Sequence, residues 1–224
     1  MTDQEILSRV DHTLLKADAS WQGIHTLCTE ALNFKTASVC IPPCYVQPVH
    51  EEFGKELVIC TVIGFPLGYA VTAAKALETE QALAHGAGEI DMVINITDIK
   101  NNCFASVLDE ISTIKKICQG KILKVIIETC YLSLEEKIRL CGIVTDAGAD
   151  FIKTSTGFGS AGAALDDVQL FRQHIGPNVK IKAAGGIKTR ESLEAFIAAG
   201  AARIGTSSAV ELLSGLRDGA GCLK

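Results

Sequence analysis

Two lysines lie near the ends of hydrophobic runs, where a charged side chain is unusual. Lys153 ends the run 151–153, and Lys182 lies in the run 179–183. A buried cation is costly unless it is paired or neutralised, and a second cation nearby lowers the pKa of one of the two. A neutral lysine is a nucleophile that forms an imine with a carbonyl compound. The alternative is that each lysine extends from a strand end to solvent.

Asp91 is the acidic residue that could work with these lysines, because it also lies inside a hydrophobic run. It is either the ion-pair partner of the lysines or a group that transfers protons, and one role does not exclude the other. Asp11 is placed similarly but in a shorter run. We interpret its neighbour His12 as structural.

Eight short runs rich in Val and Ile alternate with amphipathic stretches along the chain, about one every 28 residues. Such runs are typical of parallel strands that are buried on both faces. No linker rich in Pro, Gly or Ser divides the sequence. We therefore predict one α/β domain, residues 1–224, folded as a single (β/α)₈ TIM barrel. The expected strands are 11–15, 36–41, 57–63, 89–96, 122–128, 151–154, 179–183 and 202–205.

A weak internal repeat favours the barrel. The repeat is a helix-ending glycine followed by an apolar strand, and it occurs at Gly86, Gly148 and Gly200. Five residues after these glycines stand Asp91, Lys153 and Gly205. Alternate strands of a barrel fill the same interior layers, so we expect these three residues at similar heights. The competing fold, an open doubly wound sheet, lacks the expected GxGxxG turn with its acidic partner.

The barrel also orients the lysines of the seventh strand. Helices cover the outward faces of barrel strands, so charged strand residues should point inward. Period-2 alternation places Lys180 and Lys182 on the same face. Lys182, nearer the carboxyl end, should reach the active-site mouth. Lys180 should lie near the barrel floor, with no partner that the sequence identifies.

Glycines and hydroxyls at the same rim predict a phosphate site. They are Gly157, Gly159, Gly185, Gly186, Ser207 and Ser208. Backbone N–H groups at helix starts bind anions, and barrels often hold phosphate with the loops after strands seven and eight. Capping signals begin several helices, at 133–136, at 189–192 and at Ser208 with Glu211.

Composition excludes several classes of partner. The formal net charge of −5 argues against nucleic acid and acidic membrane surfaces. No apolar stretch is long enough to span a membrane, and the polar start, residues 1–5, is unlike a secretory signal. Nine cysteines are scattered without a CxxC pair. We predict reduced thiols, no metal site and a cytoplasmic protein.

The segment 151–158 resembles the Schiff-base signature of the deoxyribose-phosphate aldolase family. Further matching segments fall in every expected strand region, at 11–15, 38–43, 61–68, 89–93, 123–129, 182–187 and 203–208. The resemblance implies a class I aldolase, a lyase of deoxynucleoside breakdown. It would cleave 2-deoxy-D-ribose 5-phosphate reversibly to D-glyceraldehyde 3-phosphate and acetaldehyde, with no metal or organic cofactor.

The resemblance also implies residue roles. Lys153 would form the imine, Lys182 would tune its pKa, and Asp91 would relay protons with Lys182 and a water molecule. Cys40 matches a pocket cysteine that catalysis does not require. The implied substrate-binding residues are Asp11, Thr13, Cys40, Thr156, Gly157, Gly185, Gly186, Ser207 and Ser208. We expect small phosphosugar and aldehyde substrates as partners, and a homodimer or homotetramer.

Three departures from the family pattern stand out. Phe158 occupies a place where some members carry a phosphate-binding lysine, and residues 161–164 replace Gly-Gly-Ala-Thr and lose a hydroxyl. We therefore expect phosphate to depend more on backbone N–H groups, Ser207 and Ser208. Residues 221–224 lack the terminal tyrosine that some members use in proton transfer.

Two other functions remain as alternatives. One is a different barrel enzyme, such as a phosphosugar isomerase, an epimerase or another class I aldolase, which need not carry lysines on both the sixth and seventh strands. The other is a sugar-phosphate sensor without catalysis. A sensor has no use for a neutral lysine, so the aldolase is the favoured prediction.

Overall fold

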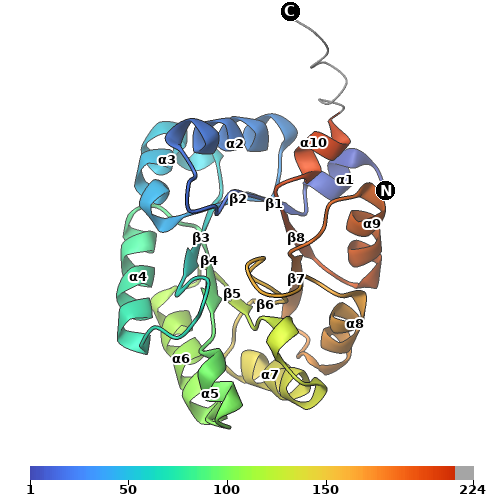
Figure 1. Ribbon diagram of the computed structural model, residues 1–224. Helices are drawn as coiled ribbons and strands as arrows, with labels where there is room; N and C mark the ends of the chain where they lie inside the picture. Colours follow the sequence, from blue (N-terminus) through green and yellow to red (C-terminus); the bar gives the residue numbers. More distant parts are fainter. Residues whose placement is uncertain (215–224) are drawn as a thin grey trace, which may run out of the picture.

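The computed structural model describes residues 1–214, so the expected features at 221–224, including Cys222, lie outside the described residues. Eight parallel strands close into a barrel in the order β1 to β8, and helices surround it (Figure 1). The strands are β1 (Val10–Thr13), β2 (Ser38–Ile41), β3 (Ile59–Ile63), β4 (Glu89–Val93), β5 (Ile122–Ile126), β6 (Phe151–Lys153), β7 (Lys180–Ala184) and β8 (Arg203–Thr206). The predicted α/β barrel is confirmed.

Helices follow the strands around the ring, and α1 precedes β1. They are α1 (Asp3–Leu7), α2 (Trp21–Phe34), α3 (Val46–Phe53), α4 (Thr72–Ala84), α5 (Ile96–Lys100), α6 (Phe104–Ile117), α7 (Leu134–Asp146), α8 (Leu165–His174), α9 (Arg190–Ala199) and α10 (Ala209–Leu213). Within residues 1–214, no helix combines the length and the hydrophobicity needed to cross a membrane.

Four strands, β1, β4, β5 and β6, end earlier than the hydrophobic pattern predicts, and local chemistry explains two of these ends. β4 stops at Val93 because Asn95 begins α5, accepting a hydrogen bond from the Thr97 N–H on its side-chain oxygen. β5 stops at Ile126 because Glu128 adopts a left-handed backbone with φ 52°. Both turns lie at the carboxyl ends of strands, where they redirect the chain over the barrel mouth.

The predicted helix signals are confirmed with one exception. Ser133 with Glu136 and Thr189 with Ser192 form capping boxes. The three repeat glycines have positive φ, at 107° (Gly86), 70° (Gly148) and 119° (Gly200). The prediction for Ser208 is wrong, since its side chain makes no capping bond and its N–H instead donates to Thr206 Oγ1.

Outward and inward strand faces differ in polarity. Outward residues such as Ile90, Val125 and Ile152 are fully buried in the apolar core between strands and helices. Inward residues include many charged groups, and alternation along the paired strands sorts them into layers. Cys40, Asp91, Lys153 and Gly205 form one layer from the even strands. Asp11, Cys60, Lys124 and Lys182 form the next from the odd strands.

The expected common height of Asp91 and Lys153 is confirmed by their direct contact. Gly205, the third repeat position, is where the interior needs a small residue. A Cβ there would lie 3.2 Å from Lys182 Cε and 3.0 Å from Ala184 Cβ. Glycine therefore leaves room for the Lys182 side chain to cross the barrel.

A second buried ion pair lies outside the barrel, between α4 and α6. Lys75 is fully buried, and its Nζ donates to Glu110 Oε1 at 2.7 Å and to the carbonyl of Val93 at 2.8 Å. Burial lowers the pKa of Lys75 and raises that of Glu110. The pair fixes the carboxyl end of β4 against the helices.

The hydroxyl that the segment 161–164 lacks would lie at the start of α8. Ala164 is the N-cap of α8, in extended conformation, and provides no side-chain cap. We expect Ala164→Thr to stabilise the protein by about 1 kcal/mol, which raises Tm by about 2–4 °C at this chain length. Thermal unfolding measures the shift. Ser133→Ala, which deletes an existing cap on α7, should lower Tm similarly, and an unchanged Tm in Ala164→Thr would contradict the assignment.

Candidate active site

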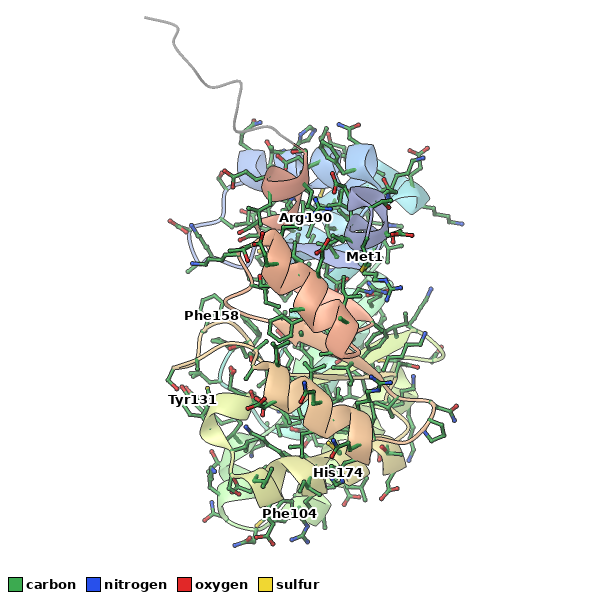
Figure 2. The ribbon with its side chains drawn as sticks, turned by 90° about the vertical axis from the view of Figure 1, so that its right-hand side faces the viewer. Met1, Phe104, Tyr131, Phe158, His174 and Arg190 are labelled. Atoms are coloured by element: carbon green, nitrogen blue, oxygen red, sulfur yellow. The ribbon has the colours of Figure 1, made fainter. Side chains whose placement is uncertain are left out.

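A cavity of about 430 Å³ opens at the carboxyl ends of the strands, between the loops that follow β1, β6, β7 and β8. Eight of the sequence-predicted site residues line it: Thr13, Lys153, Thr156, Gly157, Gly185, Gly186, Ser207 and Ser208. Phe158 lies at its edge, and Figure 2 shows it with Tyr131 on one side of the molecule, on the loops after β6 and β5. The loops thus bring these predicted residues together.

Five predicted residues do not line the cavity, and one of them is Gly159 of the expected phosphate site. Asp11, Cys40, Asp91 and Lys182 are fully buried in the barrel interior. The expectation that Asp11 and Cys40 are part of the cavity wall is therefore not met. Both side chains lie in the barrel interior without exposed surface.

Lys153 connects the buried charges to the cavity. Its side chain is 3% exposed and lines the cavity. Its Nζ donates to Asp91 Oδ2 at 2.7 Å. Neither Lys182 nor Lys124, the other lysines of the two interior layers, lines the cavity. An imine-forming amine must touch the carbonyl carbon, so Lys153 is the one of the three that can do so.

Lys182 lies directly beneath and is completely buried. Its Nζ donates to Asp91 Oδ2 at 2.6 Å and also to Asp11 Oδ2. Burial lowers the pKa of Lys182, but the attraction of Asp11 and Asp91 outweighs it and raises the pKa above the usual range. Lys182 is therefore a cation at physiological pH, close to the Lys153 amine.

Lys180 is near the barrel floor, as expected, but is exposed rather than enclosed. Its Nζ lies 5.8 Å from the centre of the Phe151 ring, which closes the interior at that end. The first residue of β7 reaches solvent below this ring. Lys180 therefore takes no part in the buried charge network.

The two buried aspartates are held ionised by their neighbours. Burial raises the pKa of Asp91, but attraction to Lys124, Lys153 and Lys182 outweighs it and holds the pKa well below its usual range. The pKa of Asp11 is lowered in the same way, against burial, by Lys182, Lys124 and Arg203. Both carboxylates can therefore accept hydrogen bonds at any working pH.

Sequence reasoning missed three charged residues of this interior. They are Lys124 on β5, Glu89 on β4 and Arg203 on β8. Lys124 is fully buried, and it interrupts a hydrophobic strand just as Lys153 and Lys182 do. The same period-2 argument would have found it. Together the strands supply four inward cations, Lys124, Lys153, Lys182 and Arg203, and three inward carboxylates, Asp11, Glu89 and Asp91.

Cys40 and Cys60, twenty residues apart in sequence, face each other on β2 and β3. They pack with Val62, Leu15 and Phe65 in a small apolar cluster inside the barrel. The two cysteines are scattered in sequence, but the strand register brings them together. Two sets of ligand atoms close enough to hold a metal ion include them: Cys40, Cys60 and Asp91, and Asp11, Cys60 and Glu89. Lysine and arginine side chains already engage the carboxylates of both sets.

Glu128 was also missed, and it shapes the loop after β6. It is buried, and its carboxylate accepts hydrogen bonds from the N–H and the hydroxyl of Thr156. The Thr156 hydroxyl oxygen in turn accepts a bond from the N–H of Phe158, at 3.0 Å. The unusual backbone of Glu128, invisible in the sequence pattern, aims the carboxylate at this loop. Glu128, which does not itself line the cavity, therefore fixes the predicted site residue Thr156 in the cavity wall.

The charge of the cavity wall favours an anion. Lys16 on the loop after β1 and Lys188 on the loop after β7 line the cavity, together with Lys153. No Asp or Glu lines it, and Lys16 and Lys188 make no ion pair within residues 1–214. They flank the serines that follow β8, because β8 lies between β7 and β1 in the barrel. Sequence reasoning overlooked both lysines.

Phe158 forms the apolar edge of this cavity. Its ring packs edge-to-face on Phe65, with 5.3 Å between the ring centres. Where some family members carry a lysine, this chain has Phe158, which joins the loops after β3 and β6 through an aromatic contact. The cations of the wall come instead from Lys16 and Lys188.

The chain is similar to aldolases over nearly its whole length. The model of the DeoC/LacD family aldolases matches residues 6–219. A deoxyribose-phosphate aldolase from Clostridium botulinum (strain Alaska E43 / Type E3) is 59% identical over 215 residues, which cover 96% of this chain and 97% of the relative. That of Clostridioides difficile (strain 630) is 55% identical over 210 residues, covering 94% and 96%.

Solved structures with more distant sequences have the same fold. The aldolase QR15 superposes with a TM-score of 0.90 at 35% identity, covering 96% of each chain. The deoxyribose phosphate aldolase of Aeropyrum pernix, described as having a unique tetrameric structure, gives 0.89 at 31% identity, covering 96% of this chain and 92% of its own. With nearly its whole length matched, the chain belongs to the DeoC/LacD family of aldolases.

Proposed function

We propose that this protein is a deoxyribose-phosphate aldolase that works through an imine on Lys153. It would cleave 2-deoxy-D-ribose 5-phosphate reversibly to D-glyceraldehyde 3-phosphate and acetaldehyde. The observation that carries the proposal is the position of Lys153, which is linked to the buried Asp91 and faces a cavity without carboxylates. The names of the relatives, aldolases at up to 59% identity, support the substrate.

The chemistry follows from the amine. The neutral Lys153 Nζ attacks C1 of the open-chain sugar, and loss of water leaves a protonated imine. A base removes the proton of the 3-hydroxyl, the C2–C3 bond breaks, and its electron pair moves to the imine as an enamine. C3 leaves as the aldehyde carbon of glyceraldehyde 3-phosphate. Protonation of the enamine at C2 and hydrolysis by water then release acetaldehyde and restore the amine.

The buried charges beneath Lys153 balance one another. Among the inward strand residues, three carboxylates are balanced by the three cations Lys124, Lys182 and Arg203. Lys153 and Lys182 both donate a hydrogen bond to Asp91 Oδ2. Asp91 and Lys182, together with water, can therefore pass protons to and from the reacting group.

The cavity wall supplies a place for the phosphate. Gly186, Ser207 and Ser208 lie on the loops after β7 and β8, with Lys188 and Lys16 on either side. Charge-assisted hydrogen bonds to phosphate are roughly twice as strong as neutral ones. We assign the phosphate to this side of the cavity and the aldehyde carbon to Lys153.

The lysines predict a preference for phosphorylated substrate. We expect Lys188→Gln to lower kcat/KM for 2-deoxyribose 5-phosphate by about 10- to 100-fold, since a hydrogen bond to a charged group contributes about 1.5–3 kcal/mol. Activity on unphosphorylated 2-deoxyribose should not change. Steady-state kinetics with both sugars measures the ratio. Lys180→Gln, at the opposite end of the barrel, should alter neither value, and an equal loss with both sugars in Lys188→Gln would refute the assignment.

Borohydride trapping tests the proposed function directly. The protein is incubated with 2-deoxyribose 5-phosphate or acetaldehyde, reduced, digested and mapped by mass spectrometry. A reduced adduct on Lys153 is the expected result. No adduct on any lysine of the folded protein would reject the imine mechanism and direct attention to a phosphosugar isomerase or a sensor.

The setting of the enzyme is part of the same proposal. We place it in the cytoplasm, in the breakdown of deoxynucleosides, acting on small phosphosugars and aldehydes without metal or organic cofactor. We also propose a homodimer or homotetramer, supported by the tetrameric description of the Aeropyrum pernix relative.

A further inference from the structure

Lys124 is a buried lysine of the barrel interior, and the proposed mechanism gives it no task beyond balancing charge. It lies on β5, has no exposed surface and does not reach the cavity. Its Nζ lies 2.6 Å from Glu89 Oε2, 2.8 Å from Asp91 Oδ1 and 3.7 Å from Asp11 Oδ2. It therefore touches every carboxylate of the barrel interior among residues 1–214.

The two oxygens of Asp91 have different partners. Oδ2 accepts hydrogen bonds from Lys153 at 2.7 Å and from Lys182 at 2.6 Å. Oδ1 accepts from Lys124 at 2.8 Å and lies 3.1 Å from Cys60 Sγ. One oxygen thus faces the reacting amine and its neighbouring cation, and the other faces away from them.

Cys60 completes the arrangement around Oδ1. Lys124 Nζ donates to Cys60 Sγ at 3.2 Å, and the thiol in turn donates to Oδ1. Burial, together with Cys40 and Asp91, raises the pKa of Cys60 well above its usual value. The group is therefore a thiol that can donate, and Oδ1 is fully occupied by Lys124 and Cys60.

Charge neutralisation alone does not explain Lys124. Arg203 Nη1 lies 2.5 Å from Asp11 Oδ1, and Arg203 Nη2 lies 3.2 Å from Glu89 Oε1, so both carboxylates have a second cation. Oδ1 of Asp91 has none besides Lys124 within residues 1–214. Among residues 1–214, Lys124 is therefore the only cation on Oδ1 of Asp91, beside the neutral Cys60 thiol.

We propose that Lys124 is a positioning residue, which holds Oδ1 of Asp91 so that Oδ2 stays between Lys153 and Lys182. This inference rests on the proposed function, because it needs Lys153 to be the imine-forming amine. Without Lys124 the carboxylate can rotate toward other donors and leave the proton path. A displacement of about 1 Å at a reacting centre can cost about 100-fold in rate.

The charged and titratable groups around Asp91 come from all the other strands and, with Glu89, from β4 itself. Lys124, Lys153 and Lys182 are in direct contact from β5, β6 and β7. Cys60 and Cys40 face it from β3 and β2, and Asp11 from β1. Glu89 and Arg203 complete the set one layer below. Because Lys124 is the strongest of the attractions that lower the pKa of Asp91, its loss makes the carboxylate easier to protonate, and activity on the acid side should then fail at a higher pH.

The test compares Lys124→Met with the double variant Lys124→Met/Glu89→Gln. The double variant removes one cation and one anion, which keeps the interior balanced and preserves folding. We expect kcat to fall about 10- to 100-fold in both and KM to stay within about threefold, since the cavity wall is unchanged. The acid limb of the kcat–pH profile should move to higher pH in both.

Lys75→Met is the matched control, because Lys75 is an equally buried lysine in an ion pair outside the barrel. It should lower Tm but leave kcat and the acid limb unchanged. The inference is overturned if either Lys124 variant, folded by circular dichroism, loses only Tm as Lys75→Met does. Borohydride trapping on the unmodified protein separates failure of the proposed function from failure of the positioning role. If no imine forms on Lys153, the proposed function has failed. If trapping is normal but the Lys124 variants keep the kcat and pH profile of the unmodified protein, only the positioning role is refuted.

Discussion

Replacing Lys153 by alanine should abolish turnover, with a loss of at least about 10⁴-fold in kcat. Lys153 is the one interior lysine of the described barrel that reaches the cavity, so no neighbouring amine can take its place. The cavity wall is otherwise intact, so the variant should still bind the phosphosugar. Retro-aldol activity coupled to detection of glyceraldehyde 3-phosphate measures the loss, and borohydride should no longer trap an adduct.

Charge and nucleophilicity can be separated at the same position. Lys153→Arg keeps a hydrogen-bond donor for Asp91 Oδ2 but has no amine that forms an imine. We expect it to be as inactive as Lys153→Ala while retaining more stability, because Asp91 keeps a partner. Near-normal turnover in either folded variant would rule out the imine mechanism.

The fold was predictable because the hydrophobic pattern and the helix-ending glycines indicated the same architecture. Hydrophobic runs marked all eight strands, and repeat glycines such as Gly148 marked helix ends that the structure confirms. The errors lie at strand ends, where local side-chain chemistry overrides the pattern. Asn95 caps a helix inside an apolar stretch, and Glu128 adopts a left-handed backbone that no periodicity signals.

Site residues were predictable where a charged side chain interrupts a hydrophobic strand. Lys153, Lys182 and Asp91 are charged residues in hydrophobic strands, and the structure brings all three together. Lys124 carries the same signal. By contrast, Lys16 and Lys188 lie on loops, where a lysine is ordinary, so only the cavity distinguishes them. The Cys40–Cys60 contact depends on strand register, which the sequence does not reveal.

Replacing Lys182 by leucine should lower kcat/KM at neutral pH by about 100- to 1,000-fold, the range typical of a lost proton-transfer group. Lys182 donates to both Asp11 and Asp91 and stays protonated, because their attraction raises its pKa. Leucine removes this cation, so three carboxylates face only Lys124 and Arg203. Asp91 then loses one of the cations that hold its pKa well below the usual range, and the proton path loses a donor.

The direction of the pH dependence follows from this balance. Attraction to Lys182 is one of the interactions that lower the pKa of Asp91, so in Lys182→Leu this carboxylate should take up a proton at a higher pH than in the unmodified protein. The acid limb of kcat/KM should therefore move to higher pH, and part of the lost activity should return in alkaline buffer. Lys180→Leu is a control on the same strand, since Lys180 is exposed below the Phe151 ring and should leave the profile unchanged. If Lys182→Leu loses the same fraction of activity at every pH, Lys182 acts by holding the carboxylates in place rather than by its charge.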